Sequence, residues 1–464
     1  MGKAHYMVKV LTEVRNSQRK LTPDTAGSEQ RKQTSLWDIA KTAKAKPKHR
    51  FRDVYRMLTP SLLWQAWHRL NKKSAIADDH LTIEEYELNL LDNLADLAER
   101  LKTKRYKTKL IRRKYIPKEN GKLRPLGIPA LEDKITQRAV AMILENIYEH
   151  DFLECSYGYR PKRSARGAIS DLNFQLQYGV TGYIVEADIK GFFDNLDHDY
   201  LLKMLAVRVD DKALLHLIRK WLKAGILEPD GMVIHPDTGT PQGGIVSPIL
   251  ANVYLHYVLD TWFQQAVKPR LRGRAFIYRY ADDWVCGFQY RDDAERFYRT
   301  MPKRLGKFNL EVEPSKTKIL RFSRFHTSRK QDQIFAFLGF EFYWWHDQAG
   351  TARIKRRTAR KKQLAKVQII KDWIKKKRHL PKHDFFGTLK RKLVGHYNYY
   401  YVVGNSRAVW SFYSQVIEQT FKWLNRRSQR KSYNWEAFRN VLRFMNVPVP
   451  RVTEKTGLNN VKLH

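Results

Sequence analysis

The sequence predicts an α+β fold, with a mixed body over about residues 80–345 followed by a basic helical region. Two patterns support this division. In the body, short apolar runs typical of strands alternate with stretches in which apolar residues recur every three or four positions, as in amphipathic helices. From Thr351 onward the period is helical, and lysine and arginine become frequent.

The elements of the body follow from these patterns in order. Residues 1–50 are polar and basic, which predicts a partly flexible N-terminal extension. Helical periodicity follows over 51–101, and Asn120-Gly121 predicts a hairpin tip within 119–123. The helix predicted over 131–150 is amphipathic, because its apolar residues recur every four positions. The other elements predicted are helices over 198–206, 212–223 and 243–265, a strand over 183–188, a hairpin over 274–288 and short strands within 307–343.

The composition favours a nucleic-acid partner. The 464 residues include 87 Lys and Arg against 47 Asp and Glu, a formal net charge of +40. Such a charge repels itself unless a polyanion covers it. The 12 Trp, 24 Tyr and 22 Phe supply rings that can stack on bases. We therefore expect an RNA or DNA partner; a small-metabolite enzyme is disfavoured, and a membrane-surface protein is the weaker alternative.

The cysteines and the apolar runs set further limits. Two cysteines, Cys155 and Cys286, are too few for a disulfide framework or a cysteine-rich zinc module, and Cys286 lies in an apolar run, as expected of a buried residue. The first twenty residues lack the apolar core of a secretory signal, and no run of 18 apolar residues occurs. We expect a cytoplasmic protein with no membrane partner.

The candidate catalytic groups are carboxylates. Four Asp-Asp pairs occur in the chain, so the pair alone carries little information. Asp282-Asp283 differs because it lies between two apolar runs, where buried acids need a cation or a proton to compensate them. Asp188 ends another apolar run. Acids at a strand end and at a strand turn offer the oxygen ligands that Mg²⁺ prefers, and two such ions suit phosphoryl transfer.

Several blocks of the sequence, in this order, resemble one protein family. They read YIPKENGKLRPLGIPALEDKITQ at 115–137, SYGYRPKRSARGAI at 156–169, IVEADIKGFFDNLDHD at 184–199, TPQGGIVSPILANVYL at 240–255, RYADDWV at 279–285, SKTK at 315–318 and LGF at 338–340. The chain resembles the reverse transcriptases encoded by group II introns, also called maturases, over about 60–440. The resemblance implies a right-hand polymerase, with fingers and palm over 51–345, an α-helical thumb or X domain over 346–440, and a tail over 441–464.

The resemblance also implies roles for individual residues. Asp188, Asp282 and Asp283 become the palm carboxylates that bind two Mg²⁺ ions, with Asp188 and Asp282 as the main ligands. The residues expected to act on the nucleotide are Lys118 and Arg124 at the triphosphate, Phe193 as a barrier to a 2′-OH, Gln242 in the nucleotide pocket, and Lys316 at the departing pyrophosphate. Taken alone, the phenylalanine could instead be a core residue, and each of the three cations a solvated charge.

The excess positive charge gathers in two segments. Eight of the thirteen residues over 102–114 and 13 of the 26 residues over 353–378 are lysine or arginine. A basic run is usually a solvated helix face. Beside a polymerase palm, we interpret both segments as sequence-blind contacts to the phosphates of template, primer and intron RNA.

The sequence departs from the family pattern in three places. Residues 74–80 read SAIADDH where many members carry a Gly-x-Asp-Gly segment, and Lys162 and Arg166 replace a common Gly and His. We also expect no Cys/His-bearing endonuclease domain after the thumb, so the chain is not expected to cut a second DNA strand itself.

The leading hypothesis is an RNA-directed DNA polymerase that extends a DNA primer on an RNA template with dNTPs. It would also bind group II intron RNA as a splicing maturase and support intron mobility at a DNA target. The alternatives are an RNA-binding splicing cofactor without polymerase activity, an RNA-dependent RNA polymerase, and a domesticated reverse transcriptase in repair or phage defence. The intact acids oppose the first alternative, and Phe193 opposes the second.

Overall fold

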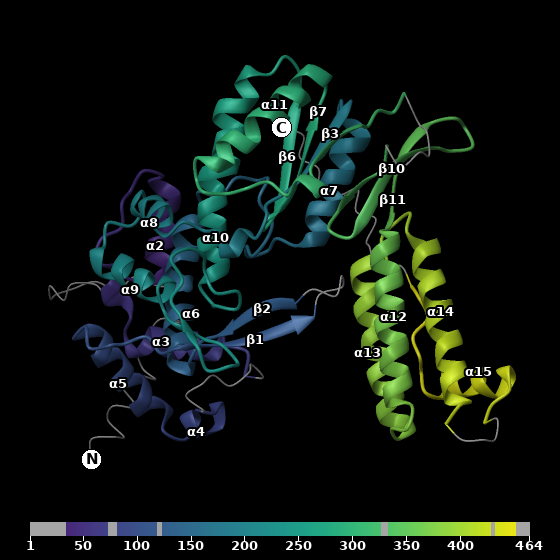
Figure 1. Ribbon diagram of the computed structural model, residues 1–464, viewed down its shortest axis with the longest axis horizontal. Coiled ribbons are helices and arrows are strands. Elements are labelled where there is room, and N and C mark those ends of the chain that lie inside the picture. Colours follow the sequence, from purple (N-terminus) through teal and green to yellow (C-terminus); the bar gives the residue numbers. More distant parts are fainter. Residues whose placement is uncertain (1–33, 73–80, 118–122, 326–332, 428–431, 452–464) are drawn as a thin grey trace, which may run out of the picture.

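The structure is a computed structural model that describes residues 34–72, 81–117, 123–325, 333–427 and 432–451. It consists of a mixed α+β body and a bundle of helices that follows strand β11 and lies below β10 and β11 in Figure 1. The predicted α+β class with a helical C-terminal region is therefore confirmed. Lys118, the hairpin tip Asn120-Gly121 and the segment 74–80 lie outside the described residues.

The first part of the body combines a small sheet with a group of helices. Its strands have the order β2-β1-β4-β5, with β1 antiparallel to β2 and parallel to β4. These strands are β1 (Ile111–Pro117), β2 (Leu123–Ile128), β4 (Ile226–Leu227) and β5 (Val233–Ile234). The helices are α2 (Leu36–Ala45), the 3₁₀ turn η1 (Val54–Met57), α3 (Pro60–His68), α4 (Ile83–Leu88), α5 (Leu90–Lys102), α6 (Leu131–Tyr148), α8 (His198–Ala206) and α9 (Lys212–Leu222).

Helix α6 is the centre of this part. The apolar stripe predicted for it is fully buried, but so are several of its polar residues, because α6 packs against α2, α3 and α10. Its polar residues therefore need partners inside the protein. Asp133 accepts hydrogen bonds from the Tyr106 hydroxyl and the Lys109 amide, and Gln137 accepts one from the amide of Ile245 at 2.9 Å.

The second part is a four-stranded antiparallel sheet with the order β6-β7-β3-β8, here called the central sheet. Its strands are β3 (Tyr183–Asp188), β6 (Ala275–Tyr280), β7 (Asp283–Phe288) and β8 (Lys318–Arg321). The elements around it are α7 (Ala165–Tyr178), η2 (Phe192–Asp194), α10 (Ser247–Leu255), η3 (His256–Asp260), η4 (Phe263–Val267), η5 (Lys268–Arg270), α11 (Arg291–Gly306), η6 (Pro314–Lys316), β9 (Phe335–Phe337), β10 (Phe340–His346) and β11 (Ala352–Thr358).

Alternation along the strands decides what covers each face of the central sheet. Val185 and Cys286 point to one side and share a core with α10 and α11. Ile184 and Val285 point to the other side, where they pack with α7 and with the three-stranded sheet β11-β10-β9. Cys286 is fully buried, as predicted. The central sheet is therefore held between two cores.

The structure confirms several predicted elements and corrects three others. The strand over 183–188, the helix over 198–206 and the hairpin within 274–288 are present. The long helix predicted over 243–265 is α-helical only from Ser247 to Leu255 and continues with π-helical turns at η3 and η4. Strand β11 pairs with β10, so the C-terminal helices begin at Arg360 rather than near Thr351.

The third correction concerns the expected N-terminal extension. Its last part forms α2, which begins with a capping box between Ser35 and Asp38. Helix α2 buries Ile39 and Ala43 in the same core as α6. This segment is therefore an integral part of the body. Apolar anchors at the helical spacing of four were too few for the sequence analysis to assign a helix.

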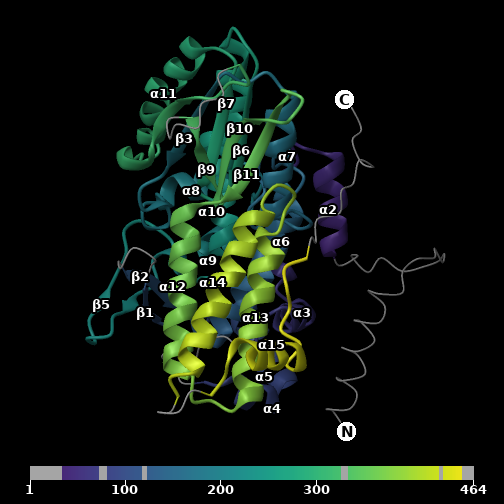
Figure 2. The same ribbon diagram turned by 90° about the vertical axis from the view of Figure 1, so that its right-hand side faces the viewer.

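The C-terminal bundle has a core of its own. It consists of α12 (Arg360–Lys377), α13 (Lys382–Tyr400), α14 (Ser406–Leu424) and α15 (Trp435–Phe444). Figure 2 shows α12, α13 and α14 running side by side, with α15 across their lower ends. Helix α12 buries only Ile370 and Ile374, so most of its side chains face outward. None of the helices that the structure describes is long and apolar enough to cross a membrane.

The core of the C-terminal bundle makes its stability pH-dependent through His396. The imidazole is 4% exposed and stacks on Phe412 with ring centroids 3.6 Å apart. Burial, aided by the charge of Lys366, lowers the pKa of His396 to about 3. The unfolded chain therefore binds a proton below about pH 6.5 that the folded bundle does not, and stability is lost as the pH falls through this range.

We predict that wild-type protein loses about 2 kcal/mol of unfolding free energy between pH 7 and pH 5 through His396, and that His396→Phe does not. Denaturant unfolding of the protein at both pH values measures this difference in unfolding free energy. His383→Phe, which changes an exposed histidine on α13, is the control. Equal pH dependence in wild type and His396→Phe would contradict the prediction.

Candidate active site

The register of the central sheet brings two of the predicted acids together. Asp188 is the last residue of β3, and it lies directly opposite Asp283, the first residue of β7. Residues opposite one another in antiparallel strands have side chains on the same face. Strand β6 ends at Tyr280, so Ala281 and Asp282 form the turn between β6 and β7. The tight turn requires a positive φ of 56° at Ala281.

Lys316 reaches the same place from another segment. The amide of Glu313 donates to the carbonyl of Asp188 at 2.8 Å, so the chain runs past the end of β3 just before η6. The Lys316 ammonium, at the end of η6, forms an ion pair with the Asp188 carboxylate. This hydrogen bond raises the pKa of Lys316. The structure therefore brings Lys316 into contact with one of the three acids, whereas its predicted action on the departing pyrophosphate stays a prediction.

The three acids lie close enough to disturb one another. Desolvation raises the pKa of Asp282, and the charge of Asp188 adds to this effect, whereas Arg124 and Lys316 oppose it. Desolvation likewise raises the pKa of Asp283 to about 7, although the amide of Leu338 donates to its carboxylate at 3.4 Å. Part of Asp283 remains exposed, so solvent still reaches this edge of the sheet. The arrangement holds more negative charge than its own lysine and arginine compensate, which favours a bound cation.

The family resemblance implies Mg²⁺ here, and the donor chemistry fits. The acids supply only oxygen ligands, which hard divalent cations prefer. Within the described ranges, no group of three or more His, Cys, Asp or Glu side chains is arranged as a metal site. Instead, the Asp188 carboxylate binds the ammonium of Lys316 and that of Asp283 faces the amide of Leu338. A divalent ion would therefore compete with Lys316 for Asp188.

A glycine-rich loop, residues 239–244, lies between strand β2 and the turn η2 that follows β3. The amide of Gly127 donates to the carbonyl of Gln242 at 2.6 Å, and the amide of Thr240 donates to the carbonyl of Phe193 at 2.7 Å. Gly243 has a φ of +113°, and a Cβ there would lie 2.4 Å from the Gly127 carbonyl oxygen. Only glycine fits such a close approach of two backbones. The loop, which itself carries Gln242, thus joins β2 to the segment that carries Phe193.

Phe193 and Arg124 are two further residues that the sequence predicts to act on the nucleotide. Phe192 is buried in the main core, whereas Phe193 is only partly buried at its rim. Phe193 thus packs against the core with part of its ring exposed, and its role at the nucleotide stays a prediction. Arg124 is exposed on β2, close enough to the β6–β7 turn for its charge to lower the pKa of Asp282.

Two tyrosines at the site were missed by the sequence analysis. Tyr159 is half exposed with a φ of 57°, and burial together with the charge of Asp282 raises its pKa. Tyr399, from α13, donates its hydroxyl to the carbonyl of Leu338 at 2.9 Å. Since the chain has 24 tyrosines, and neither of these two is adjacent to the acids in sequence, no local signal distinguishes them.

Comparisons with known proteins show what this chain is similar to. A family model described as "Reverse transcriptase (RNA-dependent DNA polymerase)" matches residues 116–342. The group II intron-encoded protein LtrA of Lactococcus lactis subsp. cremoris is 38% identical over 208 residues, which cover 44% of this chain and 34% of that protein. The match thus spans about a third of the length of LtrA.

Two further relatives show how widely the similarity extends. Protein YkfC of Escherichia coli (strain K12) is 37% identical over 290 residues, which cover 56% of this chain and 74% of YkfC. The putative COX1/OXI3 intron 1 protein of Saccharomyces cerevisiae is 27% identical over 310 residues, which cover 57% of this chain and 37% of that protein.

The ion pair between Lys316 and Asp188 predicts competition with a divalent cation. We expect Lys316→Met to bind Mg²⁺ or Mn²⁺ more tightly than wild type, by up to about fivefold, because a partly exposed ion pair contributes about 1 kcal/mol or less. Calorimetric titration of the metal-free, nucleotide-free protein measures this affinity. Lys190→Met is the matched control, because Lys190 forms an exposed ion pair with Glu311 and not with an acid of the site. Weaker metal binding in Lys316→Met than in Lys190→Met would contradict the competition.

Proposed function

Because this chain belongs to the family of group II intron-encoded reverse transcriptases and maturases, we propose that it is an RNA-directed DNA polymerase. The observation that carries the proposal is the closeness of Asp188, Asp282 and Asp283, which lie at the ends of β3 and β7 and in the β6–β7 turn. The substrates would be dNTPs, a DNA primer and an RNA template. The three acids would act as the catalytic carboxylates.

The residues of the chain divide the work of nucleotidyl transfer. Asp188 and Asp282 would hold two Mg²⁺ ions, with Asp283 beside them. When bound, such ions stabilise the charge on the attacking and leaving oxygens. Arg124, together with Lys118, would bind the triphosphate through charge-assisted hydrogen bonds. Lys316, once released from Asp188, is free to follow the pyrophosphate.

The sugar of the nucleotide would be selected by shape. Phe193 lies one short turn after β3, partly buried against Phe192, with ring centroids 5.4 Å apart. This packing limits the movement of its ring, and a rigid ring beneath the sugar leaves no room for a 2′-OH. Gln242, on the adjoining loop, would line the same pocket.

Helix α12 supplies a surface suited to nucleic-acid phosphates. Its exposed cations are Arg360, Lys361, Lys362, Lys366, Lys375, Lys376 and Lys377. Since phosphate contacts are long-range and independent of sequence, this surface suits template and primer as well as folded RNA. We propose that the chain also binds group II intron RNA as a maturase and supports mobility at a DNA target. The free thiols of Cys155 and Cys286 suit a reducing cytoplasm.

The polymerase proposal predicts that Asp282→Asn lowers primer extension on an RNA template by about 10³-fold or more, because several kcal/mol of charge stabilisation are lost. RNA affinity should change little, since the bound RNA relies on basic surface elsewhere. Single-turnover dNTP incorporation and a filter-binding titration measure the two quantities.

Asp292→Asn is the matched control for this experiment. Asp292 also belongs to an Asp-Asp pair, but it is exposed on α11 and binds Arg272. Retained synthesis in Asp282→Asn would refute the site. RNA binding by wild type without dNTP incorporation would instead support a splicing cofactor whose polymerase is inactive.

The steric role of Phe193 predicts altered sugar selection. In Phe193→Val, the preference for dNTPs over NTPs should fall by roughly 10- to 200-fold, the range that one steric contact supplies. The ratio of kcat/KM for the two nucleotide classes measures this. Phe174→Val, at an exposed position on α7, is the control. A wild-type preference for NTPs would favour an RNA polymerase, and an unchanged ratio in Phe193→Val would remove Phe193 from the pocket.

A further inference from the structure

Arg279 is a charged residue in the interior of the central sheet. It precedes Tyr280 at the end of β6, immediately before the turn that carries Asp282. Two hydrogen bonds, of 2.8 and 2.6 Å, join its Nε and Nη2 to the two carboxylate oxygens of Asp260. Neither side chain of this pair has any exposed surface. Asp260 is presented from the π-helical turn η3, a type of turn that is frequent at functional sites.

The other donors of Arg279 reach three separate segments. Nη2 also donates to Ser156 Oγ at 2.7 Å, and Nη1 donates to Asn252 Oδ1 and to the carbonyl of Ala281, both at 3.0 Å. A guanidinium has five N–H donors in one rigid plane, so every donor of Arg279 is used. Lysine, with a single ammonium on a flexible stem, could not hold this geometry.

The contact with Ala281 connects this network to the acids. The carbonyl of Ala281 belongs to the planar peptide group that joins Ala281 to Asp282. Ala281 has a φ of 56°, a conformation that residues other than glycine rarely adopt. By holding this oxygen, Arg279 stabilises the strained turn and fixes the direction in which the chain enters Asp282.

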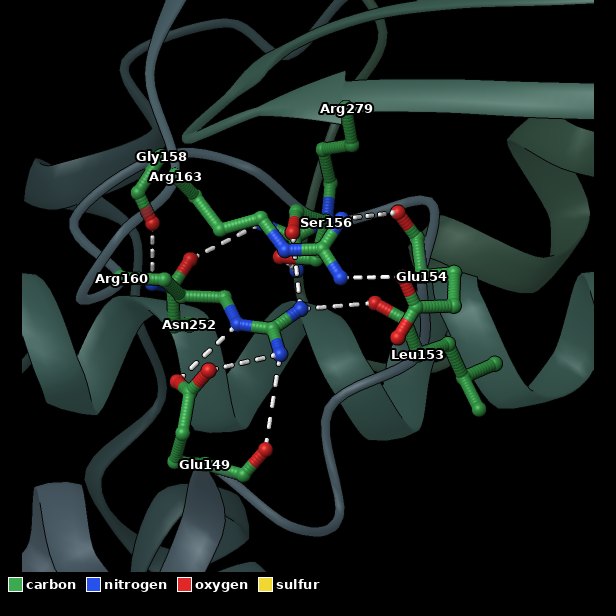
Figure 3. Close-up of polar contacts among 9 residues, drawn as sticks. All are labelled: Glu149, Leu153, Glu154, Ser156, Gly158, Arg160, Arg163, Asn252 and Arg279. Atoms are coloured by element: carbon green, nitrogen blue, oxygen red, sulfur yellow. Dashed lines mark hydrogen bonds and ion pairs between the residues drawn. The ribbon is translucent and has the colours of Figure 1, made fainter. Parts of the chain in front are cut away.

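The segment 155–158 packs against the β6–β7 turn and hydrogen-bonds the end of β6. The amide of Arg279 donates to the carbonyl of Cys155, and the amide of Tyr157 donates to the carbonyl of Arg279, both at 2.8 Å. Asn252 Nδ2 donates to the carbonyl of Gly158 at 2.7 Å (Figure 3). A Cβ on Gly158 would lie 2.4 Å from the amide nitrogen of Ala281, so the segment lies directly against the turn.

A second arginine anchors this segment. Nη1 of Arg160 donates to the carbonyls of Leu153 and Ser156, each at 2.8 Å, as Figure 3 shows. Its Nε and Nη2 bind the carboxylate of Glu149, at the end of α6, at 3.1 and 3.0 Å. The support beneath the turn therefore continues to the central helix of the body.

We propose that Arg279, held by Asp260, is a positioning residue that keeps the Ala281–Asp282 peptide, and with it the Asp282 carboxylate, in the orientation that nucleotidyl transfer requires. The inference rests on the proposed polymerase function. Since none of the five donors of Arg279 is left for a substrate, its loss should act on the chemical step and not on nucleotide or RNA binding.

The test must separate positioning from stability. Replacing a buried ion pair by apolar residues of similar volume is often neutral for folding, whereas removing one partner leaves an uncompensated charge. The variant is therefore the double exchange Arg279→Met with Asp260→Leu. The matched control is Arg208→Met with Asp151→Leu, which removes another ion pair, between a buried arginine and a mostly buried acid, away from the turn.

We expect the Arg279/Asp260 double variant to lower the single-turnover rate of dNTP incorporation by about 10²-fold, the effect of displacing a catalytic group by about 1 Å. The Kd values for dNTP and RNA should stay within about twofold of wild type. Hydrogen exchange in the metal-free protein should accelerate over 280–284 in this variant only. The control pair should leave both the rate and this exchange unchanged.

Gly158→Ala tests the same turn with every ion pair intact, should the double variant fail to fold. Its Cβ would press on the Ala281 amide and should lower the incorporation rate at unchanged Kd. Gly167→Ala, whose Cβ would meet nothing closer than 3.5 Å, is its control. An unchanged rate of dNTP incorporation in Gly158→Ala would overturn the proposal. So would a loss of this rate in both double variants, at Arg279/Asp260 and at Arg208/Asp151, together with faster hydrogen exchange throughout the chain. If wild type itself incorporates no dNTP, the polymerase function fails. The positioning role is tested separately by hydrogen exchange: it fails if exchange over 280–284 in the Arg279/Asp260 double variant is the same as in wild type.

Discussion

The repulsion among three carboxylates is the interaction on which the rest of this structure depends. Asp188 and Asp283 are held opposite one another by the register of β3 and β7, and Asp282 follows in the adjoining turn. Antiparallel pairing on both sides of β3 prevents these groups from moving apart. Because the backbone cannot relieve the repulsion, relief comes from protonation of Asp283, whose pKa is raised to about 7, and from positive charge. Lys316 supplies positive charge directly through its ion pair with Asp188, and Arg124 supplies it from β2 of the other sheet.

Holding acids in this way requires a rigid support, and the central sheet provides it by being buried on both faces. One core joins it to α10 and α11, and the other joins it to α7 and to the sheet of β9, β10 and β11. A sheet buried on both faces has little room for a charged side chain. Arg279 is tolerated inside because all five of its donors have acceptors. The free-energy cost of burying the Arg279 charge is offset by these hydrogen bonds, one of which stabilises the turn at Ala281.

Sequence reasoning succeeded where a local pattern decides the structure. Strand β3, helix α8 and the β6–β7 hairpin were predicted closely, because apolar runs and helical periodicity express burial directly. It failed where distant contacts decide. Strand β11 is basic and resembles the helix that follows it, and only its pairing with β10 makes it a strand. For the same reason, the apolar runs beside the acids mark them as candidates, whereas the position of Tyr159 near Asp282 depends on contacts that no pattern near it records.

The net charge of +40 and the three central acids are two parts of one electrostatic arrangement. Cations spread over α12 attract phosphates from any direction, so by themselves they cannot orient a reacting group. The acids act over a few ångströms, where geometry matters. One contact between the acids and the C-terminal bundle is made by Leu338, whose amide donates to Asp283 while its carbonyl accepts the hydroxyl of Tyr399 from α13. Gly339, with a φ of 79°, lets this turn approach Tyr400 as well. A shift of α13 on binding nucleic acid would therefore act on the surroundings of Asp283 through two hydrogen bonds.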